Sequence, residues 1–314
     1  MSSIVGDHPW IYQPLAANWP EVVPVDYVRL TKPRSVLLLL VAALAGMVVA
    51  RPEMPPVHLI LETLLAGALA AGGANALNCY LDRDLDRQMR RTTGRPLPSG
   101  KLVPGRALLF GLTLSAVSVT IFALGVNWLS AALAACGIFY YVVVYTLWLK
   151  RASHWNVVIG GAAGALPLLV GSAAAIGRIA PLPLWLGVVV LLWTPPHFWS
   201  LALLRRREYA AAGIPMLPVV RGEASTRRQI LGYSIVLFLT TLLLVPAGFA
   251  GTGFLAASLI LGVILLFLAV RLLMTATDLA AWHIYRYSIA YLALLFISMI
   301  LDRASGWMLL PGAS

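Results

Sequence analysis

A short stripe of amide and carboxylate side chains is the part of this sequence best suited to chemistry. Asn78, Asp82 and Asp86 follow one another at intervals of four residues, and Asn75 precedes Asn78 by three. In a helix, residues three or four apart share one face, with their Cβ atoms about 5–6 Å apart. The spacing therefore predicts one polar stripe, whereas Asp84, two residues from each neighbour, is predicted to point away from it.

The two carboxylates of the stripe repel each other on one helix face, so they favour a cation between them. Hard oxygen ligands select Mg²⁺ or Ca²⁺ over zinc or copper, and Mg²⁺ typically combines one or two carboxylates with phosphate oxygens of a substrate. The arginines that follow carry the planar forks that phosphate prefers. The residues therefore predict a magnesium site for a diphosphate, with Asp82 and Asp86 as metal ligands. A solvated helix extension, its acids paired with neighbouring arginines, is the alternative that spacing alone leaves open.

A second polar segment, residues 193–218, carries one acid instead of a pair. His197 follows two prolines that are predicted to break the helix, and Glu208 lies between Arg205 and Tyr209. We treat His197, Arg205, Glu208 and Tyr209 as a candidate second site. Two plainer interpretations stay open, because the arginines suit a stop-transfer cluster and a membrane histidine is usually hydrogen-bonded packing.

These segments must be positioned by helices in a membrane. Hydrophobic residues make up 60% of the 314, charged residues only 11%, and the mean hydropathy is +0.86, whereas a soluble domain carries roughly a quarter charged residues. About 20 apolar residues cross the hydrocarbon core, and the apolar runs lack the alternation of barrel strands. The chain is therefore predicted to be an all-α, polytopic membrane protein of about nine spanning helices. They are expected at 35–50, 57–80, 106–125, 128–148, 156–176, 182–204, 229–249, 252–273 and 285–301.

The position of the stripe favours a metal and diphosphate site over a solvated helix extension. It grows out of the span expected at 57–80, whose last turn carries Asn75 and Asn78. Polar side chains at membrane depth are costly and are functional by default. The links after the second and sixth spans are also long, and long ordered loops are usually functional. We therefore expect function in these two loops.

Basic residues are distributed unevenly between the two sides of the predicted membrane. Of the 23 Lys and Arg side chains, 20 fall on one side, and only Arg51, Arg178 and Arg303 fall on the other. The positive-inside rule then places the N-terminus in the cytoplasm and the C-terminus across the membrane. Residues 1–25 are predicted to be a flexible cytoplasmic tail and residues 26–314 a single transmembrane domain. Topology and attraction to anionic lipid explain the net charge of +11, so no nucleic-acid partner is expected.

Asn78, Asp82 and Asp86 form the pattern Asn-x-x-x-Asp-x-x-x-Asp, which resembles the first metal-diphosphate motif of the intramembrane UbiA-type prenyltransferases. Longer stretches resemble the branch of this family that farnesylates haem b. These stretches are residues 31–34, 75–98, 149–171, 193–218 and 286–291. The resemblance covers nearly the whole chain after residue 25.

The resemblance implies a ring of nine helices around a central cavity that opens sideways to lipid. It implies Mg²⁺-assisted transfer of a farnesyl group from farnesyl diphosphate to a vinyl group of haem b, giving haem O and diphosphate as a step toward haem A. Water addition would complete the hydroxyethylfarnesyl side chain. The implied partners are farnesyl diphosphate, haem b, membrane lipid and the downstream haem A synthase, in the cell inner membrane.

The resemblance also implies roles for individual residues. Asn78, Asp82 and Asp86 become the catalytic motif, with Asn78 and Glu208 as further candidate metal ligands. Candidates for contact with the diphosphate oxygens are Lys32, Arg34, Arg90, Arg91, Arg95, Lys150 and Arg151. The wider family usually has several aspartates in its second motif, whereas this chain keeps only Glu208 there. That departure fits the haem-farnesylating branch, which generally has a single acid at this place.

Two other functions stay open on the sequence. A prenyltransferase with a quinone-precursor or chlorin acceptor would use the same first motif. A transporter of an anionic solute would place its ionisable groups near the bilayer midplane, often on broken helices of related repeats. Here the acids lie at the predicted cytoplasmic edge and no convincing internal repeat is found, so transport is the less favoured hypothesis.

Overall fold

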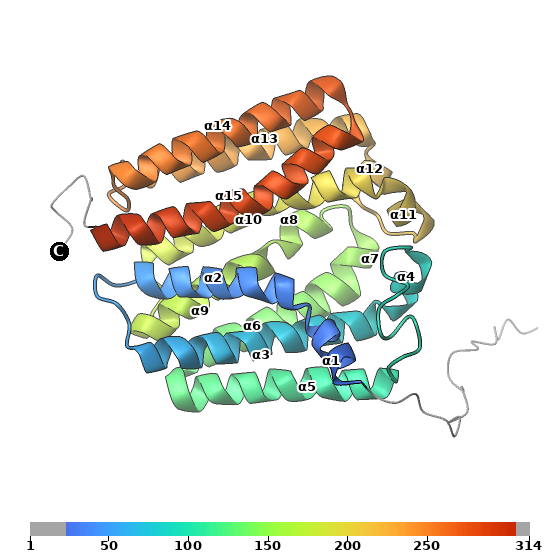
Figure 1. Cartoon of the computed structure of the whole chain (residues 1–314), viewed down its shortest axis with the longest axis horizontal. Helices are drawn as coiled ribbons and strands as arrows, with labels where there is room; N and C mark the ends of the chain where they lie inside the picture. Colours follow the sequence, from blue (N-terminus) through green and yellow to red (C-terminus); the bar gives the residue numbers. More distant parts are fainter. Residues whose placement is uncertain (1–22, 306–314) are drawn as a thin grey trace, which may run out of the picture.

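The computed structural model describes residues 23–305, and every regular element in that range is helical (Figure 1). The all-α prediction is therefore confirmed. Residues 1–22 and 306–314 lie outside the described residues, so most of the predicted tail at 1–25 and the predicted placement of the C-terminus cannot be followed in the structure. The elements are α1 (Pro24–Thr31), α2 (Pro33–Val49), α3 (Val57–Leu81), α4 (Arg83–Gln88), α5 (Pro104–Ile121), η1 (Phe122–Val126), α6 (Trp128–Phe139), η2 (Tyr140–Leu149), α7 (Lys150–Ala152), α8 (Asn156–Gly160), α9 (Ala162–Ile176), α10 (Pro181–Leu204), α11 (Arg206–Ala211), α12 (Leu217–Val220), α13 (Glu223–Leu242), α14 (Thr252–Thr275) and α15 (Asp278–Ser305).

Seven helices of the described chain are long and apolar enough to cross a membrane. The pair α1 and α2, bent by 48° at Lys32, makes an eighth as one broken span. The one predicted span still unmatched, the seventh in chain order at 229–249, corresponds to α13, which is less apolar because its first turns carry Glu223, Arg227 and Arg228. The prediction of a polytopic helical protein is confirmed, and the count of nine is approximate.

The far end of α13 differs from the prediction. That span was expected at 229–249, but the helix ends at Leu242 and the chain continues as turns to Phe249. Pro246 has no backbone N–H to continue a helix, and Gly248 takes a left-handed φ of 75° that closes the turn.

The helix α10 also differs from the prediction, because it is not broken at its double proline. It runs without interruption from Pro181 to Leu204, with Pro195 and Pro196 inside it. Of all the spanning helices that the structure describes, α10 has the largest buried share, 72% of its window. The prediction of a break is wrong because packing on both sides of α10 outweighs the backbone hydrogen bonds that the prolines remove, a tolerance common in membrane helices.

The spanning helices form a closed ring. Each one contacts the next along the chain, in the order α2, α3, α5, α6, α9, α10, α13, α14 and α15, and α15 returns to α2. Contact between α2 and α9 crosses this ring, where Gly46 faces the backbone of Leu168 and Gly171 faces that of Ala43. These close backbone approaches require glycine. The ring that the resemblance implied is confirmed, and its central cavity stays a prediction.

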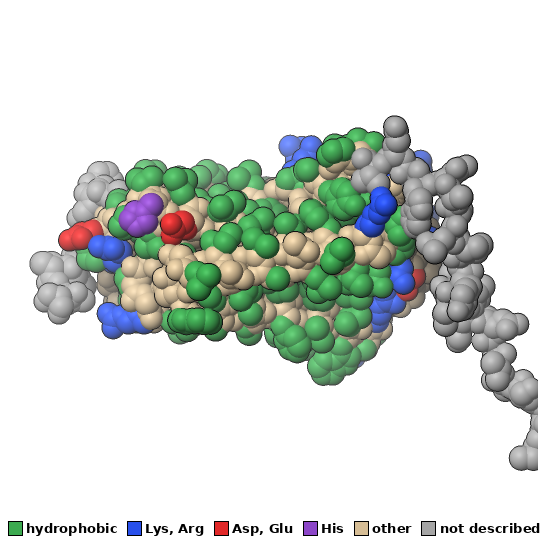
Figure 2. All heavy atoms as spheres, turned by 90° about the horizontal axis from the view of Figure 1, so that it is seen from below, with side chains coloured by type: hydrophobic (Ala, Val, Ile, Leu, Met, Phe, Trp, Pro, Cys, Tyr) green, Lys and Arg blue, Asp and Glu red, His purple; other side chains and the backbone are tan. Residues whose placement is uncertain are grey.

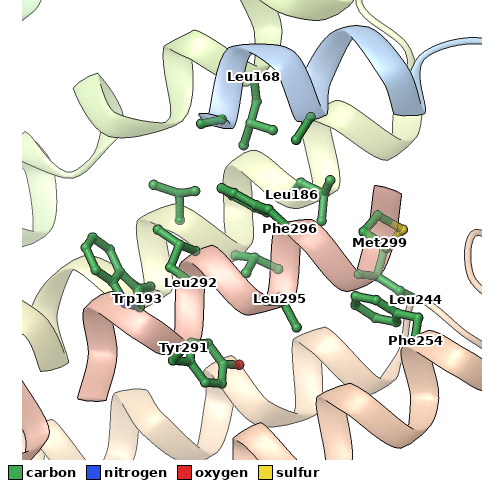
Figure 3. Packing of buried hydrophobic residues seen from close by; sticks show 14 of the residues in the cluster. Leu168, Leu186, Trp193, Leu244, Phe254, Tyr291, Leu292, Leu295, Phe296 and Met299 are labelled. Carbon is green, nitrogen blue, oxygen red and sulfur yellow. The ribbon is translucent and has the colours of Figure 1, made fainter. Parts of the chain in front are cut away.

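The largest apolar core lies in the half of the ring that contains α10 and α15. Figure 3 shows Trp193 of α10 beside Leu292 of α15, and Leu186 of α10 beside Phe296 of α15. The outside of the bundle is apolar as well: leucines such as Leu109 and Leu124 are 66% and 80% exposed, and apolar side chains cover the middle of the molecule in Figure 2. Such a surface suits lipid, so the chain is a multi-pass membrane protein.

The two ends of the bundle are built differently. The short helices α4, α7, α11 and α12 gather at one end, on the right in Figure 1. We call this the α4/α11 end. The start of α2 and the ends of α3 and α10 reach toward it, so the two long loops that were predicted to carry function meet there.

Candidate active site

The predicted polar stripe lies at the α4/α11 end, where α3 passes into α4. The N–H of Asp82 donates to the Asn78 carbonyl at 2.9 Å, and the N–H of Asp86 donates to the Asp82 carbonyl at 2.8 Å. Helical spacing therefore continues across the junction between the two helices. Asn78, Asp82 and Asp86 are 4%, 1% and 4% exposed, whereas the side chain of Asp84 is 55% exposed. The stripe shares one buried face, and Asp84 points away from it.

Hydrogen bonds fix the orientation of the Asn78 amide. Its Nδ2 donates to Asp82 Oδ2 at 2.8 Å and to Thr146 Oγ1 at 3.0 Å. Its Oδ1 accepts from the ammonium of Lys32 at 2.6 Å. Lys32 stands at the bend between α1 and α2 in a left-handed conformation, with φ 53° and ψ 63°, which is costly for a residue with a side chain. The bend points its ammonium at the stripe.

Each buried carboxylate of the stripe accepts a hydrogen bond from a basic side chain. Lys150, at the start of α7, donates to Asp82 Oδ2 at 2.5 Å, and Arg95 donates to Asp86 Oδ2 at 2.6 Å. The structure thus brings three of the seven predicted diphosphate-binding cations, Lys32, Lys150 and Arg95, onto the stripe. Buried charges require such partners.

Arg151 has a different partner. Its guanidinium donates to both oxygens of Asp84 at 2.8 Å and to the Leu81 carbonyl at 2.8 Å, and it lies 3.9 Å from Asp82 Oδ1. The hydrogen bond from Arg151 lowers the pKa of the Asp84 carboxyl. Arg151 therefore ties α7 to α4 from the outside, next to the stripe.

The other predicted cations lie at the surface. Arg34, Arg90 and Arg91 are exposed, and within residues 23–305 none of the three takes part in an ion pair. Arg91 acts electrostatically on Tyr209, so it lies between the two loops. These three side chains are available to an anionic ligand at the α4/α11 end.

The second loop supplies one carboxylate near the first. Arg205 donates to Glu208 Oε1 at 3.0 Å, while Glu208 Oε2 is buried and has no hydrogen-bond partner. Tyr209 is buried, and that burial raises the pKa of its hydroxyl. An apolar cluster joins the loops, because Leu85 and Met89 of the first pack with residues of the second.

His197 lies apart from Arg205, Glu208 and Tyr209, deeper in α10. Its ring is stacked between Trp193 and Tyr285, with centroid distances of 4.5 and 5.0 Å. Its Nδ1 lies 2.8 Å from Ser288 Oγ. The four residues of the candidate second site are therefore split between the loop and the membrane span.

The residues of the stripe fit a hard divalent cation. Asp82 Oδ1 is buried and accepts no hydrogen bond, and a buried oxygen left in that state is unfavourable. Within residues 23–305 no three His, Cys, Asp or Glu side chains are grouped to hold a metal by themselves. Mg²⁺ would therefore be held by Asp82 and Asp86, with phosphate oxygens or water completing its coordination.

Sequence reasoning missed Thr146. Its hydroxyl accepts from Asn78 and donates to the Tyr141 carbonyl at 2.8 Å, five residues back along the π-helix η2. π-helices are rare and often mark functional sites. In the same helix the rings of Tyr141 and Tyr145 stack at 5.6 Å, and Asp82 is within electrostatic reach of both. The sequence signal that could have identified Thr146 is its hydroxyl, which stands in an apolar span four residues before Lys150.

Fold and site together define a polytopic membrane protein that presents buried carboxylates and cations at one end of a helical ring. The chain belongs to the UbiA prenyltransferase family, which matches residues 39–300. The predicted family is therefore confirmed.

Relatives of the chain carry a more specific name. It is 47% identical over 279 residues to the protoheme IX farnesyltransferase of Roseiflexus castenholzii, covering 89% of this chain and 52% of that protein. It is 48% identical over 279 residues to the protoheme IX farnesyltransferase of Symbiobacterium thermophilum, covering 88% of this chain and 93% of that protein. The chain thus spans about half the length of the first relative and nearly all of the second.

Solved structures share the fold. A structure of digeranylgeranylglyceryl phosphate synthase superposes with a TM-score of 0.75 at 15% identity, covering 90% of this chain and 98% of that one. A UbiA homolog from Archaeoglobus fulgidus, bound to GPP and Mg²⁺, superposes with a TM-score of 0.62 at 16% identity, covering 87% and 99%. At these identities the likeness concerns the fold.

Proposed function

We propose that this chain transfers the farnesyl group of farnesyl diphosphate to a vinyl group of haem b, giving haem O and diphosphate as a step toward haem A. The observation that carries the proposal is the pair of buried carboxylates, Asp82 and Asp86, surrounded by cations at one end of a lipid-facing ring. The choice of haem b as acceptor is supported by relatives named protoheme IX farnesyltransferase, one of which matches this chain over 93% of its length.

The site suits departure of a diphosphate. Bound Mg²⁺ would neutralise charge that builds on the leaving group, and Asp82 and Asp86 would hold it. The substrate would draw Lys150 and Arg95 from the carboxylates onto its own oxygens, because a diphosphate carries more charge than either carboxylate. Lys32, held on Asn78 Oδ1, would add a third contact. Such preorganised charge is usually the largest catalytic contribution.

The reaction that this site would support joins farnesyl and one water molecule to the vinyl group of haem b and releases diphosphate. The bond between the allylic carbon and the diphosphate oxygen breaks, and the allylic carbon joins the terminal vinyl carbon of haem. Water adds to the other vinyl carbon and releases a proton. Stacked Tyr141 and Tyr145 lie beside the stripe and would favour a cationic intermediate through their ring faces.

The second loop is proposed as a supporting contact. Glu208 presents one buried oxygen that has no hydrogen-bond partner, so it can accept a second cation or a substrate donor. Arg205 donates to its other oxygen, and Arg91 of the first loop acts electrostatically on the neighbouring Tyr209. A second metal ion at Glu208 would have only this one carboxylate.

The orientation in the membrane follows from charge. We propose that the α4/α11 end faces the cytoplasm of the cell inner membrane, since the basic loops collect there. Farnesyl diphosphate would arrive from that side, while haem b and the product partition into lipid. The product would diffuse within the membrane to the downstream haem A synthase.

The test is product formation by the full chain in lipid nanodiscs supplied with haem b, farnesyl diphosphate and Mg²⁺. Mass spectrometry should detect a haem enlarged by one farnesyl group and one water, with equal release of diphosphate. Parallel reactions replace haem b with a quinone precursor or a chlorin. Turnover only with one of those acceptors would reject haem, and no turnover with any acceptor would reject the proposal.

A further inference from the structure

Two side-chain hydrogen bonds join the polar stripe to the end of η2. Asn78 Nδ2 donates to Thr146 Oγ1 at 3.0 Å, and the ammonium of Lys150 donates to Asp82 Oδ2 at 2.5 Å. Asn78 and Asp82 are four residues apart, and so are Thr146 and Lys150. Lys150 is a proposed diphosphate contact. Thr146 carries no charge, so its place beside the stripe requires another explanation.

The π-helix fixes Thr146 as a hydrogen-bond acceptor. Its hydroxyl donates to the Tyr141 carbonyl, five residues back, at 2.8 Å, whereas Ser and Thr in α-helices usually donate to the carbonyl four residues back. A hydroxyl has one hydrogen, so the oxygen of Thr146 can only accept from Asn78. Thr146 is 0% exposed, so water does not compete for this contact.

The three partners of Asn78 agree on one orientation of its amide. The two hydrogens of Nδ2 go to Asp82 Oδ2 and Thr146 Oγ1, and Oδ1 accepts from the ammonium of Lys32 at 2.6 Å. In a flipped amide, Oδ1 would face two acceptors and the NH₂ group would face an ammonium that can only donate. Thr146 therefore helps to keep Oδ1 turned toward Lys32.

Lys32 differs from the other two cations on the stripe. Lys150 and Arg95 each donate to a carboxylate, whereas Lys32 donates to a neutral amide oxygen and, among residues 23–305, forms no ion pair. The two carboxylates of the stripe act on Lys32 electrostatically. If the Asn78 amide could turn, the ammonium would move to one of these carboxylates. The fixed amide thus keeps the charge of Lys32 available to an anionic ligand.

We propose that Thr146 is a positioning residue for the diphosphate. Its hydroxyl holds the Asn78 amide, and Asn78 Oδ1 holds the Lys32 ammonium where the diphosphate would bind. Thr146 itself would not touch the substrate. This inference rests on the proposed function and adds to it a residue that acts through two others.

The experiment measures equilibrium binding of farnesyl diphosphate, with Mg²⁺ and without haem b, to the full chain in lipid nanodiscs. Thr146→Val keeps the volume but removes the hydroxyl, and it should weaken binding about 10-fold. Thr146→Ser keeps the hydroxyl and should bind like the wild type. Thr226→Val is the matched control, because Thr226 is also 0% exposed and its hydroxyl donates to the Gly222 carbonyl, away from the stripe. It should bind like the wild type.

A double-mutant cycle tests whether Thr146 acts through Lys32. Lys32→Met should weaken binding at least as much as Thr146→Val, and the double variant should bind no more weakly than Lys32→Met alone, because both changes remove the same contact.

The outcomes separate this inference from the proposed function. If the two losses multiply in the double variant, Thr146 does not act through Lys32 and the inference is wrong. Wild-type affinity in Thr146→Val, or equal losses in Thr146→Ser and Thr146→Val, would also overturn it. In each of these cases the wild type still binds farnesyl diphosphate and the proposed function stands. A wild type that does not bind farnesyl diphosphate contradicts the proposed function, and this inference falls with it.

Discussion

The two loops that meet at the α4/α11 end are held by different forces. In the first loop, Asp82 and Asp86 are buried, and they pair with Lys150 of α7 and with Arg95 of the same loop, respectively. In the second, the ion pairs of Arg205 with Glu208 and of Arg206 with Glu223 and Asp278 involve partly exposed side chains, and the buried contacts are apolar, made by residues such as Ile214 and Leu217. The first loop therefore has buried ion pairs, whereas the ion pairs of the second lie at its surface. The difference suggests that diphosphate chemistry belongs to the first loop and that the second covers and supports it.

The largest effect should come from removing the divalent cation. Chelation should abolish farnesyl transfer, because Asp82 and Asp86 are left facing the diphosphate without the ion between them. Adding Mg²⁺ back should restore it. The check is the rate of diphosphate release in nanodiscs across a Mg²⁺ titration. Full activity in chelator would contradict a metal role for the first loop.

A smaller loss is expected from Lys150→Met. The change removes the cation on Asp82 that would move to the leaving diphosphate, so kcat/KM for farnesyl diphosphate should fall about 10²–10³-fold. Lys101→Met, at an exposed position of the same predicted face, is the control and should keep its rate. Equal losses in both variants would show that general surface charge, and not the Asp82 partner, matters.

Substitutions in the second loop should lower the free energy of unfolding more than they lower the rate of farnesyl transfer. Leu217 is 1% exposed, so Leu217→Ala should cost about 2–5 kcal/mol of unfolding free energy. Glu208→Gln removes charge without removing volume and should cost much less. Thermal unfolding of the detergent-solubilised variants compares the two. If Glu208→Gln lowers the unfolding free energy as much as Leu217→Ala, the Glu208 ion pair stabilises the loop as strongly as its apolar contacts do.

The smallest effect concerns Asp84 and pH. Its pKa is lowered in the folded protein by the hydrogen bond from Arg151, so this pair stabilises the fold above the unfolded carboxyl pKa of about 3.9 and the stabilisation is lost as pH falls through the folded value. Because the Asp84 side chain is 55% exposed, the contribution is about 0–1 kcal/mol. Asp84→Asn should remove this small acid dependence from unfolding curves measured between pH 3 and 6.

Much of the fold followed from the sequence because membrane helices are defined by apolar length. The polar stripe also followed, since Asp82 and Asp86 keep helical spacing even where α3 passes into α4. Two features depended on tertiary packing and could not be predicted. The helix α10 stays continuous through Pro195 and Pro196 because its neighbours bury it, and Thr146 reaches Asn78 only through the π-helix η2.

The pairing of the cations was likewise beyond sequence reasoning. Seven basic residues were candidates for the diphosphate, and they could not be ranked because all lie on the same predicted face. The structure places Lys32 on the stripe through a left-handed bend and turns Arg151 outward to Asp84. Both arrangements depend on how α1, α2, α4 and α7 are packed, which periodicity does not contain.

The most direct test compares three neighbouring aspartates in the Mg²⁺-dependent transfer of farnesyl to haem b. We predict that Asp82→Asn and Asp86→Asn each lose about 10³-fold or more in kcat, because both belong to the buried stripe. Asp84→Asn should lose only a few-fold, since its carboxylate lies outside and pairs with Arg151. Equal losses in all three variants would contradict the assignment of the metal and diphosphate to one buried face of this loop.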